Sequence, residues 1–485
     1  MSHDGKGQAD SERFPNYARH RSGRRNFLKV LGVSTAAGLA GCMGDDSGTD
    51  TAGGDTATAT PVGTPGEWPD YTGETVEIFI FDDFQRPNYK AVADKFKEET
   101  GGQVKLQVSD ADIQELIQRL QAGSAPDIIR SNRTTMAGFI GEGVLEPMDG
   151  FVEYFEEVWD TNLDDKFRWQ QNGHDWMVPM SFLYNTNYYR TDMYEQTPDT
   201  WQKLEEEAKR VDDPDGIRGA FVPANAPGAA HNLSWDLMSW FWSNNANMVQ
   251  RNGGDLEVVF DKGKNRERVI ETLKFRKRIH NNYSSRATDA SWGAQGQAIT
   301  NEVSAQTTLL IGLVKGSAIS NESPFKDAIA PTRMPYNADR HSSRPDVTTV
   351  GAQTGWIRFK GASDASLDYM KMLLQPEFYP KFSITEAPAS IPPTNAVRES
   401  EIYQNRLSEL DDSWTDEMID TMFSQEAIGS TVADEVKPPN PFASQMINSG
   451  AFQDMTFRAF IEGHDIGTVV DETGQRFRNI MNENM

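Results

Sequence analysis

The sequence contains almost no cysteine: Cys42 is the single thiol among 485 residues. One thiol cannot form an internal disulfide, so the fold must be stabilised by its apolar core rather than by cross-links. The length is sufficient for two or three domains. Long hydrophobic runs are also lacking beyond the first 42 residues, where none approaches the roughly 18 apolar residues of a membrane-spanning helix.

Basic residues are scarce, since 47 Lys and Arg face 72 Asp and Glu and the net charge is −25. This sign repels phosphate backbones and argues against a nucleic-acid partner. Residues 1–42 carry +4, which leaves −29 for the rest of the chain. Such an excess opposes compaction unless salt screens it, and the Debye length falls to about 3 Å at 1 M salt. The acidity therefore favours a protein adapted to molar salt, with an ordinary acidic secreted protein as the alternative.

Several common enzyme motifs are missing. The seven histidines form no HExxH motif and no i, i+4 pair, and neither a GxSxG elbow nor a complete phosphate-binding loop occurs. The turn after the first predicted strand carries Asp82 and Asp83 in place of a glycine fingerprint, which disfavours a dinucleotide. We therefore expect no cofactor and no metal site.

The N-terminus is built differently from the remainder. Arg24 and Arg25 precede a short apolar segment at 30–40, which ends in Leu39-Ala-Gly-Cys42. A basic region, a short apolar region and small residues are the parts of an export signal, whereas a buried helix is the alternative. The segment resembles a twin-arginine signal (1–42) with a lipobox. The resemblance implies lipidation of Cys42 and anchoring at the extracellular face of the cell membrane.

Residues 43–69 are rich in Thr, Gly and Asp and have few apolar side chains to bury. Such a composition predicts a disordered tether between an anchor and a folded body. Together with the twin-arginine signal and the acidity, this tether resembles those of lipoproteins from halophilic archaea.

From Thr75 onward the hydrophobic periodicity alternates between the strand and the helix pattern. A βαβαβ order of this kind predicts a parallel sheet covered by helices. The predicted elements are a strand at 76–81, a helix through 89–96 that stops at 101–102, a strand at 104–108, a helix through 113–120 and a strand at 127–129.

Ligands of open parallel sheets lie beyond the carboxyl ends of the strands. At those ends the chain carries polar residues, which we predict to contact a ligand. For Asp82 and Asp83, capping of the next helix is the alternative role. The candidates are Asp82, Asp83, Arg130, Ser131 and Asn132.

An ordered set of segments is the strongest signal in the chain, although no single segment is diagnostic. The segments are Phe96–Gly102, Gly123–Ile129, Gly141–Asp149, Met177–Asn185, Pro198–Leu204, Gly351–Phe359, Ala387–Pro393 and Ile461–His464. This set resembles the family 1 extracellular solute-binding proteins, which include maltose-binding protein, over most of residues 74–485.

The resemblance implies an α/β, two-lobed periplasmic-binding-protein-like fold (type II), in which each lobe is a mainly parallel sheet flanked by helices. A small solute would bind in the cleft between the lobes, and the protein, a monomer, would deliver it to an ABC permease. Lobe 1 would comprise 70–182 plus 352–397, and lobe 2 would comprise 183–351 plus 398–485. The chain would cross near Ser181 to Tyr184, which makes both residues candidate ligand contacts, and near Val350 to Gly351.

Within this frame the tryptophans are candidates for stacking on sugar rings. Trp235 and Trp242 are seven residues apart on one helical face, while Trp240 points elsewhere, and burial of two of the three is the alternative. We expect Trp235 to line the cleft because it opens the helix after a polar loop. Trp356, beside a crossing strand, would either stack on the ligand or wedge the lobes.

The predicted function is capture of a carbohydrate or polyol for import. Two alternatives remain open at this point. The first is a non-sugar solute such as a polyamine. The second is a surface enzyme acting on polysaccharide, with Asp82 and Asp83 as an acid–base pair.

Overall fold

The computed structural model describes residues 68–80, 85–108, 112–227, 232–310, 312–384 and 390–484. All of them belong to one compact unit, Ala57–Met485. Cys42, the predicted tether up to residue 67, Asp82 and Asp83 lie outside the described residues. Within the described ranges, no helix is both long and apolar enough to cross a membrane.

The predicted βαβαβ start is confirmed. Strand β1 pairs in parallel with β2 on one side and with β3 on the other. Helix α2 ends at Gly101, whose φ of 71° is left-handed and is readily adopted by glycine. The elements are β1 (Thr75–Ile80), α2 (Arg86–Thr100), β2 (Gln103–Val108), α3 (Asp112–Gln121) and β3 (Ile128–Asn132).

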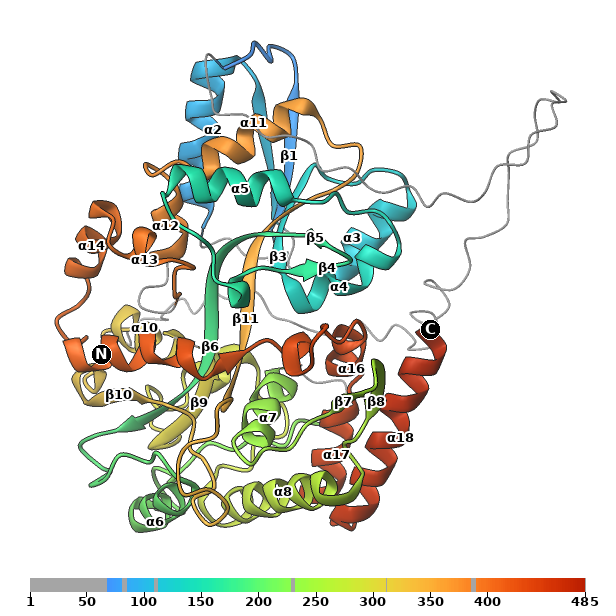
Figure 1. The fold of residues 1–485 in the computed structure, drawn as a ribbon. Coiled ribbons are helices and arrows are strands. Elements are labelled where there is room, and N and C mark those ends of the chain that lie inside the picture. Colours follow the sequence, from blue (N-terminus) through green and yellow to red (C-terminus); the bar gives the residue numbers. More distant parts are fainter. Residues whose placement is uncertain are drawn as a thin grey trace, which may run out of the picture. The chain divides into compact units, whose positions relative to one another are not determined.

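Two long antiparallel strands, β6 (Val178–Arg190) and β11 (Thr349–Arg358), connect the upper and lower groups of elements in Figure 1. The second half of β11 pairs with β3 on one side and with the first half of β6 on the other. The second half of β6 pairs with β9 (Gln306–Leu310) and β10 (Ile329–Thr332), and the start of β11 pairs with β12 (Gly429–Ser430). One mixed sheet results, with the order β10-β6-β11-β3-β1-β2. Tyr184 and Gly351, at the two predicted crossing points, pair directly.

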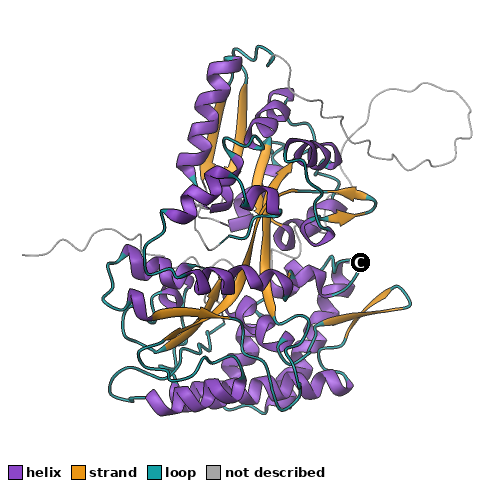
Figure 2. Cartoon of the chain, turned by 60° about the vertical axis from the view of Figure 1, so that its left-hand side comes forward, coloured by secondary structure: helices purple, strands orange, loops and turns teal. Residues whose placement is uncertain are grey.

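Helices flank the strands in both lobes (Figure 2). In the second lobe β9 and β10 pair with β6 in antiparallel fashion, so the parallel ladders are those of β1 to β3 and of β11 with β12. A strand shared by both lobes runs against its neighbours, which explains the mixed pattern. The first lobe also holds α4 (Arg133–Gly141), α5 (Asp149–Val158), η1 (Asp165–Phe167), β4 (Gln170–Gln171), β5 (His174–Asp175), α11 (Asp364–Leu373) and α12 (Tyr379–Ile384).

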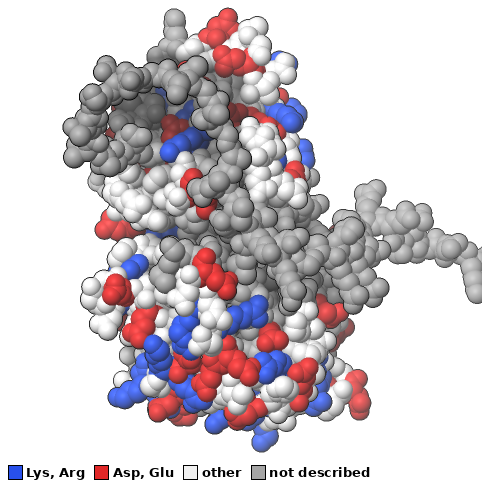
Figure 3. Space-filling view, turned by 90° about the vertical axis from the view of Figure 1, so that its right-hand side faces the viewer, with Lys and Arg blue, Asp and Glu red and all other residues white. Residues whose placement is uncertain are grey.

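The second lobe is largely helical. An ion pair between Arg266 and Asp471 (2.6 Å) joins α8 (Gly263–Tyr283) to α18 (Ile466–Asn484) at its surface. Both signs of charge mix on the face shown in Figure 3. Its elements are α6 (Trp201–Val211), α7 (Asn232–Trp242), β7 (Val249–Asn252), β8 (Asp255–Val258), α8 (Gly263–Tyr283), α9 (Trp292–Gly296), α10 (Leu313–Ser320), η2 (Lys326–Ala328), η4 (Val432–Glu435), α16 (Ala443–Asn448), α17 (Ala451–Phe460) and α18 (Ile466–Asn484).

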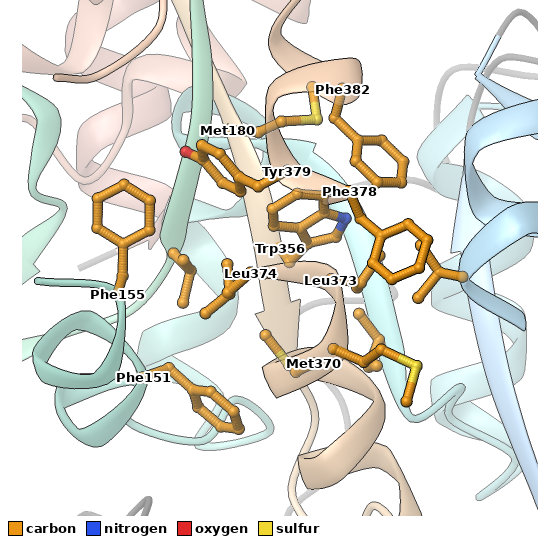
Figure 4. Close-up of a cluster of buried hydrophobic side chains, with 14 of the residues drawn as sticks. Phe151, Phe155, Met180, Trp356, Met370, Leu373, Leu374, Phe378, Tyr379 and Phe382 are labelled. Carbon is orange, nitrogen blue, oxygen red and sulfur yellow. The ribbon is translucent and has the colours of Figure 1, made fainter. Parts of the chain in front are cut away.

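Separate hydrophobic clusters form the cores of the two lobes. The first surrounds Trp356 with side chains from β6, α5, α11 and α12 (Figure 4). In the second, Phe260 packs edge-to-face against Phe241, Phe452 and Phe477. Each lobe therefore has its own core, and the sheet strands connect them.

A segment near the C-terminus passes between the lobes. Helix α14 (Glu401–Ser408), which follows α13 (Asn395–Arg398), packs against α12 of the first lobe. Helix α15 (Asp416–Phe423), followed by η3 (Ser424–Ala427), instead packs against β10 of the second. The chain thus remains on the first lobe beyond residue 398, because the buried side chains of Val397 and Trp414 belong to that core.

Candidate functional site

The carboxyl end of β3 supplies three of the predicted site residues. Arg130 and Ser131 are buried, and Ser131 Oγ makes no hydrogen bond to any described residue. Asn132 is half-buried and caps α4, because its Oδ1 accepts a hydrogen bond from the N–H of Thr135 at 2.8 Å. A buried hydroxyl without a protein partner is uncommon, and a hydroxylated ligand is one way to satisfy it.

Ser181 lies close to Asn132 across the sheet. The register of β11 pairs Thr354 with Asn132 on one side and with Ser181 on the other. The hydroxyl oxygens of Ser181 and Thr354 are 2.9 Å apart, so these two side chains hydrogen-bond to each other. The structure therefore brings the predicted residues of β3 and β6 together at the point where the strands leave the first lobe.

Tyr184 is fully buried at the crossing. Its ring stacks on Phe182 at 4.7 Å, and a side chain at Gly429 would overlap it. The tyrosine hydroxyl has no hydrogen-bond partner among the described residues, and burial raises its pKa well above the usual value. Tyr184 thus has a buried hydroxyl group without a partner among the described residues, and no exposed ring face.

Trp235 lies in the first turn of α7 and is half-buried. Asn185 of β6 donates to the carbonyl of Trp235 (2.9 Å) and to Ser239 Oγ (3.0 Å), and Ser239 Oγ accepts the N–H of Val350 (2.9 Å). Helix α7 is therefore attached to both crossing strands. Trp240 and Trp242 are buried, so of the three tryptophans on this helix Trp235 retains an accessible ring.

Trp356 is placed differently from a ligand contact. It is fully buried in the core of the first lobe, where its indole N–H donates to the hydroxyl of Tyr89 at 2.9 Å and Phe382 lies perpendicular to it (Figure 4). No ring face is left for a solute in this conformation. The reason is the register of β11, which sets Trp356 beside Val178, inside the first lobe rather than at the crossing.

The residue after the predicted group, Arg133, was not among the sequence-based candidates. Its guanidinium pairs with Asp434 of η4 at 2.6 Å, and their side chains are 2% and 7% exposed. Burial lowers the pKa of Arg133, while Asp434 raises it. A second ion pair, Lys166 with Glu426, also joins the two lobes at 2.6 Å. The sole sequence signal for Arg133 was its position at the polar end of β3, and nothing local pointed to Asp434.

The described residues contain no group of three or more His, Cys, Asp or Glu side chains able to hold a metal ion. Near the crossing strands they hold buried hydroxyl groups and the buried cation Arg133, and the partly buried indole of Trp235 packs against the core of the second lobe. These groups are suited to hydrogen bonding and stacking.

Comparisons with known proteins agree with this geometry. Residues 85–377, more than half of the chain, match the family described as bacterial extracellular solute-binding protein. Among solved structures, maltose-bound MalE3 of T. maritima is 16% identical, with a TM-score of 0.67, and the match covers 84% of this chain and 100% of that one. A solute-binding protein of an ABC transporter from Thermotoga lettingae, bound with alpha-D-tagatose, is also 16% identical, with a TM-score of 0.65. That match covers 85% of this chain and 100% of the other.

A further solute-binding protein, from Agrobacterium radiobacter K84 in complex with ribitol, is 14% identical, with a TM-score of 0.64 over 84% of this chain and 98% of that one. At these identities the likeness establishes the two-lobed fold. The matching family consists of binding proteins, which removes the polysaccharide enzyme from the alternatives. The chain belongs to the bacterial extracellular solute-binding proteins.

Proposed function

We propose that this protein captures a small carbohydrate or polyol outside the cell and delivers it, as a monomer, to an ABC importer. The observation that carries the proposal is the pair of buried hydroxyls, Ser131 Oγ and Tyr184 Oη, that lack hydrogen-bond partners among the described residues. The three similar structures named above hold maltose, tagatose and ribitol, all of which are polyhydroxylated.

The chemistry of the region favours such a ligand. Sugar hydroxyls both donate and accept, as Ser and Tyr hydroxyls do, and the apolar face of a sugar ring stacks on an indole such as that of Trp235. A polyamine instead requires carboxylates. Two carboxylates at the contact between the lobes are already paired, Asp434 with Arg133 and Glu426 with Lys166.

The test is a titration of the purified protein with sugars, polyols and polyamines, followed by calorimetry and by small-angle scattering. We expect a sugar or polyol to bind and to reduce the radius of gyration, because a ligand that contacts both lobes favours the closed form. Trp235→Ala should weaken binding by about 1–3 kcal/mol. Trp292→Ala is the control, because it removes another half-buried indole, on α9, and should leave the binding affinity unchanged. Binding of spermidine in the absence of any sugar or polyol binding would refute the proposal.

We also propose that Cys42 carries a lipid anchor behind a twin-arginine signal. The support is the order of twin arginines, apolar segment and Leu39-Ala-Gly-Cys42 in the sequence. Cys42→Ser should release the protein from membranes in a fractionation at high salt. One acyl chain binds only marginally, so a firm anchor implies two chains or an added signal. If wild type and variant were retained equally in the membrane fraction, lipidation of Cys42 would be contradicted.

The acidic composition supports a halophilic origin as the third part of the proposal. Because −29 charges repel one another when unscreened, the melting temperature should fall as salt is reduced from molar to about 0.1 M, where the Debye length is about 10 Å. Surface pairs such as Arg266 with Asp471 would strengthen at low salt and oppose this trend. A flat or rising melting temperature would therefore count against adaptation to salt.

A further inference from the structure

A second polar cavity lies on the second lobe, between the end of β10 and helix α15. Its volume is about 610 Å³, within the range of small-molecule sites. None of the predicted ligand contacts lines it, and neither Arg133 nor Asp434 does. The cavity is therefore separate from the region between the lobes.

One wall of this cavity is cationic. Arg333 directly follows β10, and Arg344 stacks on the ring of Tyr336 at 5.1 Å while donating to the backbone carbonyls of Met334 and Asp199. Burial, together with the neighbouring Arg333, lowers the pKa of Arg344 to about 10, while Asp199 opposes this shift. Within the described residues, neither forms an ion pair with a carboxylate.

The opposite wall is anionic and comes from α15. Glu417, Asp420 and Ser424 are three, then four, residues apart and so share one face of the helical segment. Both carboxylates are exposed and make no ion pair with a described cation. Arg333 Nε donates to Ser424 Oγ at 2.8 Å and thereby connects the walls. Opposite charges thus face one cavity without neutralising each other.

We propose that this cavity binds a small zwitterionic solute of amino-acid type, with its carboxylate on Arg333 and Arg344 and its ammonium group on Glu417 and Asp420. A simple anion would be repelled by α15, and a simple cation by the two guanidinium groups. The planar donor fork of arginine matches a carboxylate. The third acidic residue of the lining, Asp199, is not assigned to the solute, because its Oδ1 already lies 2.9 Å from Lys203 Nζ.

The experiment is calorimetric titration of the full chain with glycine, 4-aminobutyrate and 6-aminohexanoate, which differ in the separation of their charges. Acetate and methylammonium are titrated in parallel as the isolated anion and cation. We expect at least one zwitterion to bind at least tenfold more tightly than either. Equal binding of acetate would indicate an anion site and overturn the proposal, as would the absence of binding by every zwitterion.

Variants locate the binding and separate it from the cleft. Arg333→Gln and the exposed substitution Asp420→Asn should each weaken zwitterion binding at least tenfold, without affecting the sugar or polyol bound between the lobes. Arg340→Gln is the matched control, because Arg340 lies on the same loop but pairs with Glu271 outside the cavity. Unchanged zwitterion affinity in both cavity variants, with melting temperatures near wild type, would refute the site.

Discussion

The first lobe encloses the indole of Trp356, whereas the second lobe encloses the ion pair between Asp236 and Arg276. Around Trp356 the neighbours are apolar or aromatic, and one hydrogen bond to Tyr89 satisfies the indole N–H. In the second lobe, Arg276 Nη2 lies 2.6 Å from Asp236 Oδ2, with side chains 2% and 5% exposed.

The charges in the second lobe are well compensated. Trp240 Nε1 donates to Asp236 Oδ1 at 3.1 Å, and the guanidinium of Arg276 lies 5.1 Å from the centre of the same indole ring. Burial raises the pKa of Asp236 and lowers that of Arg276, while each partner opposes this effect on the other. The comparison teaches that both lobes depend on apolar packing, and that the second lobe in addition buries an ion pair whose members cannot be removed singly.

The largest effect is expected from Trp356→Ala. Removing a fully buried indole leaves a cavity and should cost about 3–5 kcal/mol of unfolding free energy. Hydrogen exchange should show the loss of protection in β1, α2 and α12, with α7 and α8 little changed. Trp356→Phe, which retains most of the volume, is the control and should cost less. An equal loss of hydrogen-exchange protection in both lobes would show that their cores unfold as one unit.

Asp236→Ala should give a slightly smaller loss, about 3 kcal/mol, because Arg276 is left buried without its partner. Loss of hydrogen-exchange protection should then centre on α7 and α8. Arg278→Ala, two residues from Arg276 on α8, is the control, since its pair with Glu205 is at the surface, and should cost about 0–1 kcal/mol. If the two variants were equally stable, the buried pair would not distinguish the second core.

The last effect concerns pH. Glu435 accepts hydrogen bonds from Trp242 Nε1 and from the N–H groups of Met248 and Val249, yet desolvation outweighs them and raises its pKa from 4.5 to about 7. The folded protein thus holds this proton more tightly than the unfolded chain. The resulting stability is present at low pH and is lost as the pH rises from about 4.5 through about 7.

Denaturant unfolding of wild type and Glu435→Gln across this pH range isolates the contribution. Relative to the variant, wild type should lose on the order of 3 kcal/mol as the pH rises. The difference should appear in the second lobe, where Glu435 connects η4 to α7 and β7. Parallel pH profiles would show that the carboxyl group titrates normally.

The sequence predicted the start of the first lobe well because its signals are local. Alternation in β1 and β2, the apolar face of α2 and the stop at Gly101 each depend on neighbouring residues. Of the site, the polar end of β3 could be predicted from the rule for parallel sheets, and Ser181 and Tyr184 from the family resemblance. The burial of Trp356 could not, because only the pairing of β11 with β6 places it beside Val178, five residues beyond the crossing at Gly351.

The amino-acid sequence by itself determined the family and the parallel start of the sheet, since periodicity and segment order are properties of the chain alone. Only the tertiary structure decided which groups meet between the lobes. Arg133 and Asp434 pair across a large separation in the sequence, and the hydroxyls of Ser131 and Tyr184 are buried in the folded chain. Burial and long-range pairing depend on the whole fold, so no local pattern contains them.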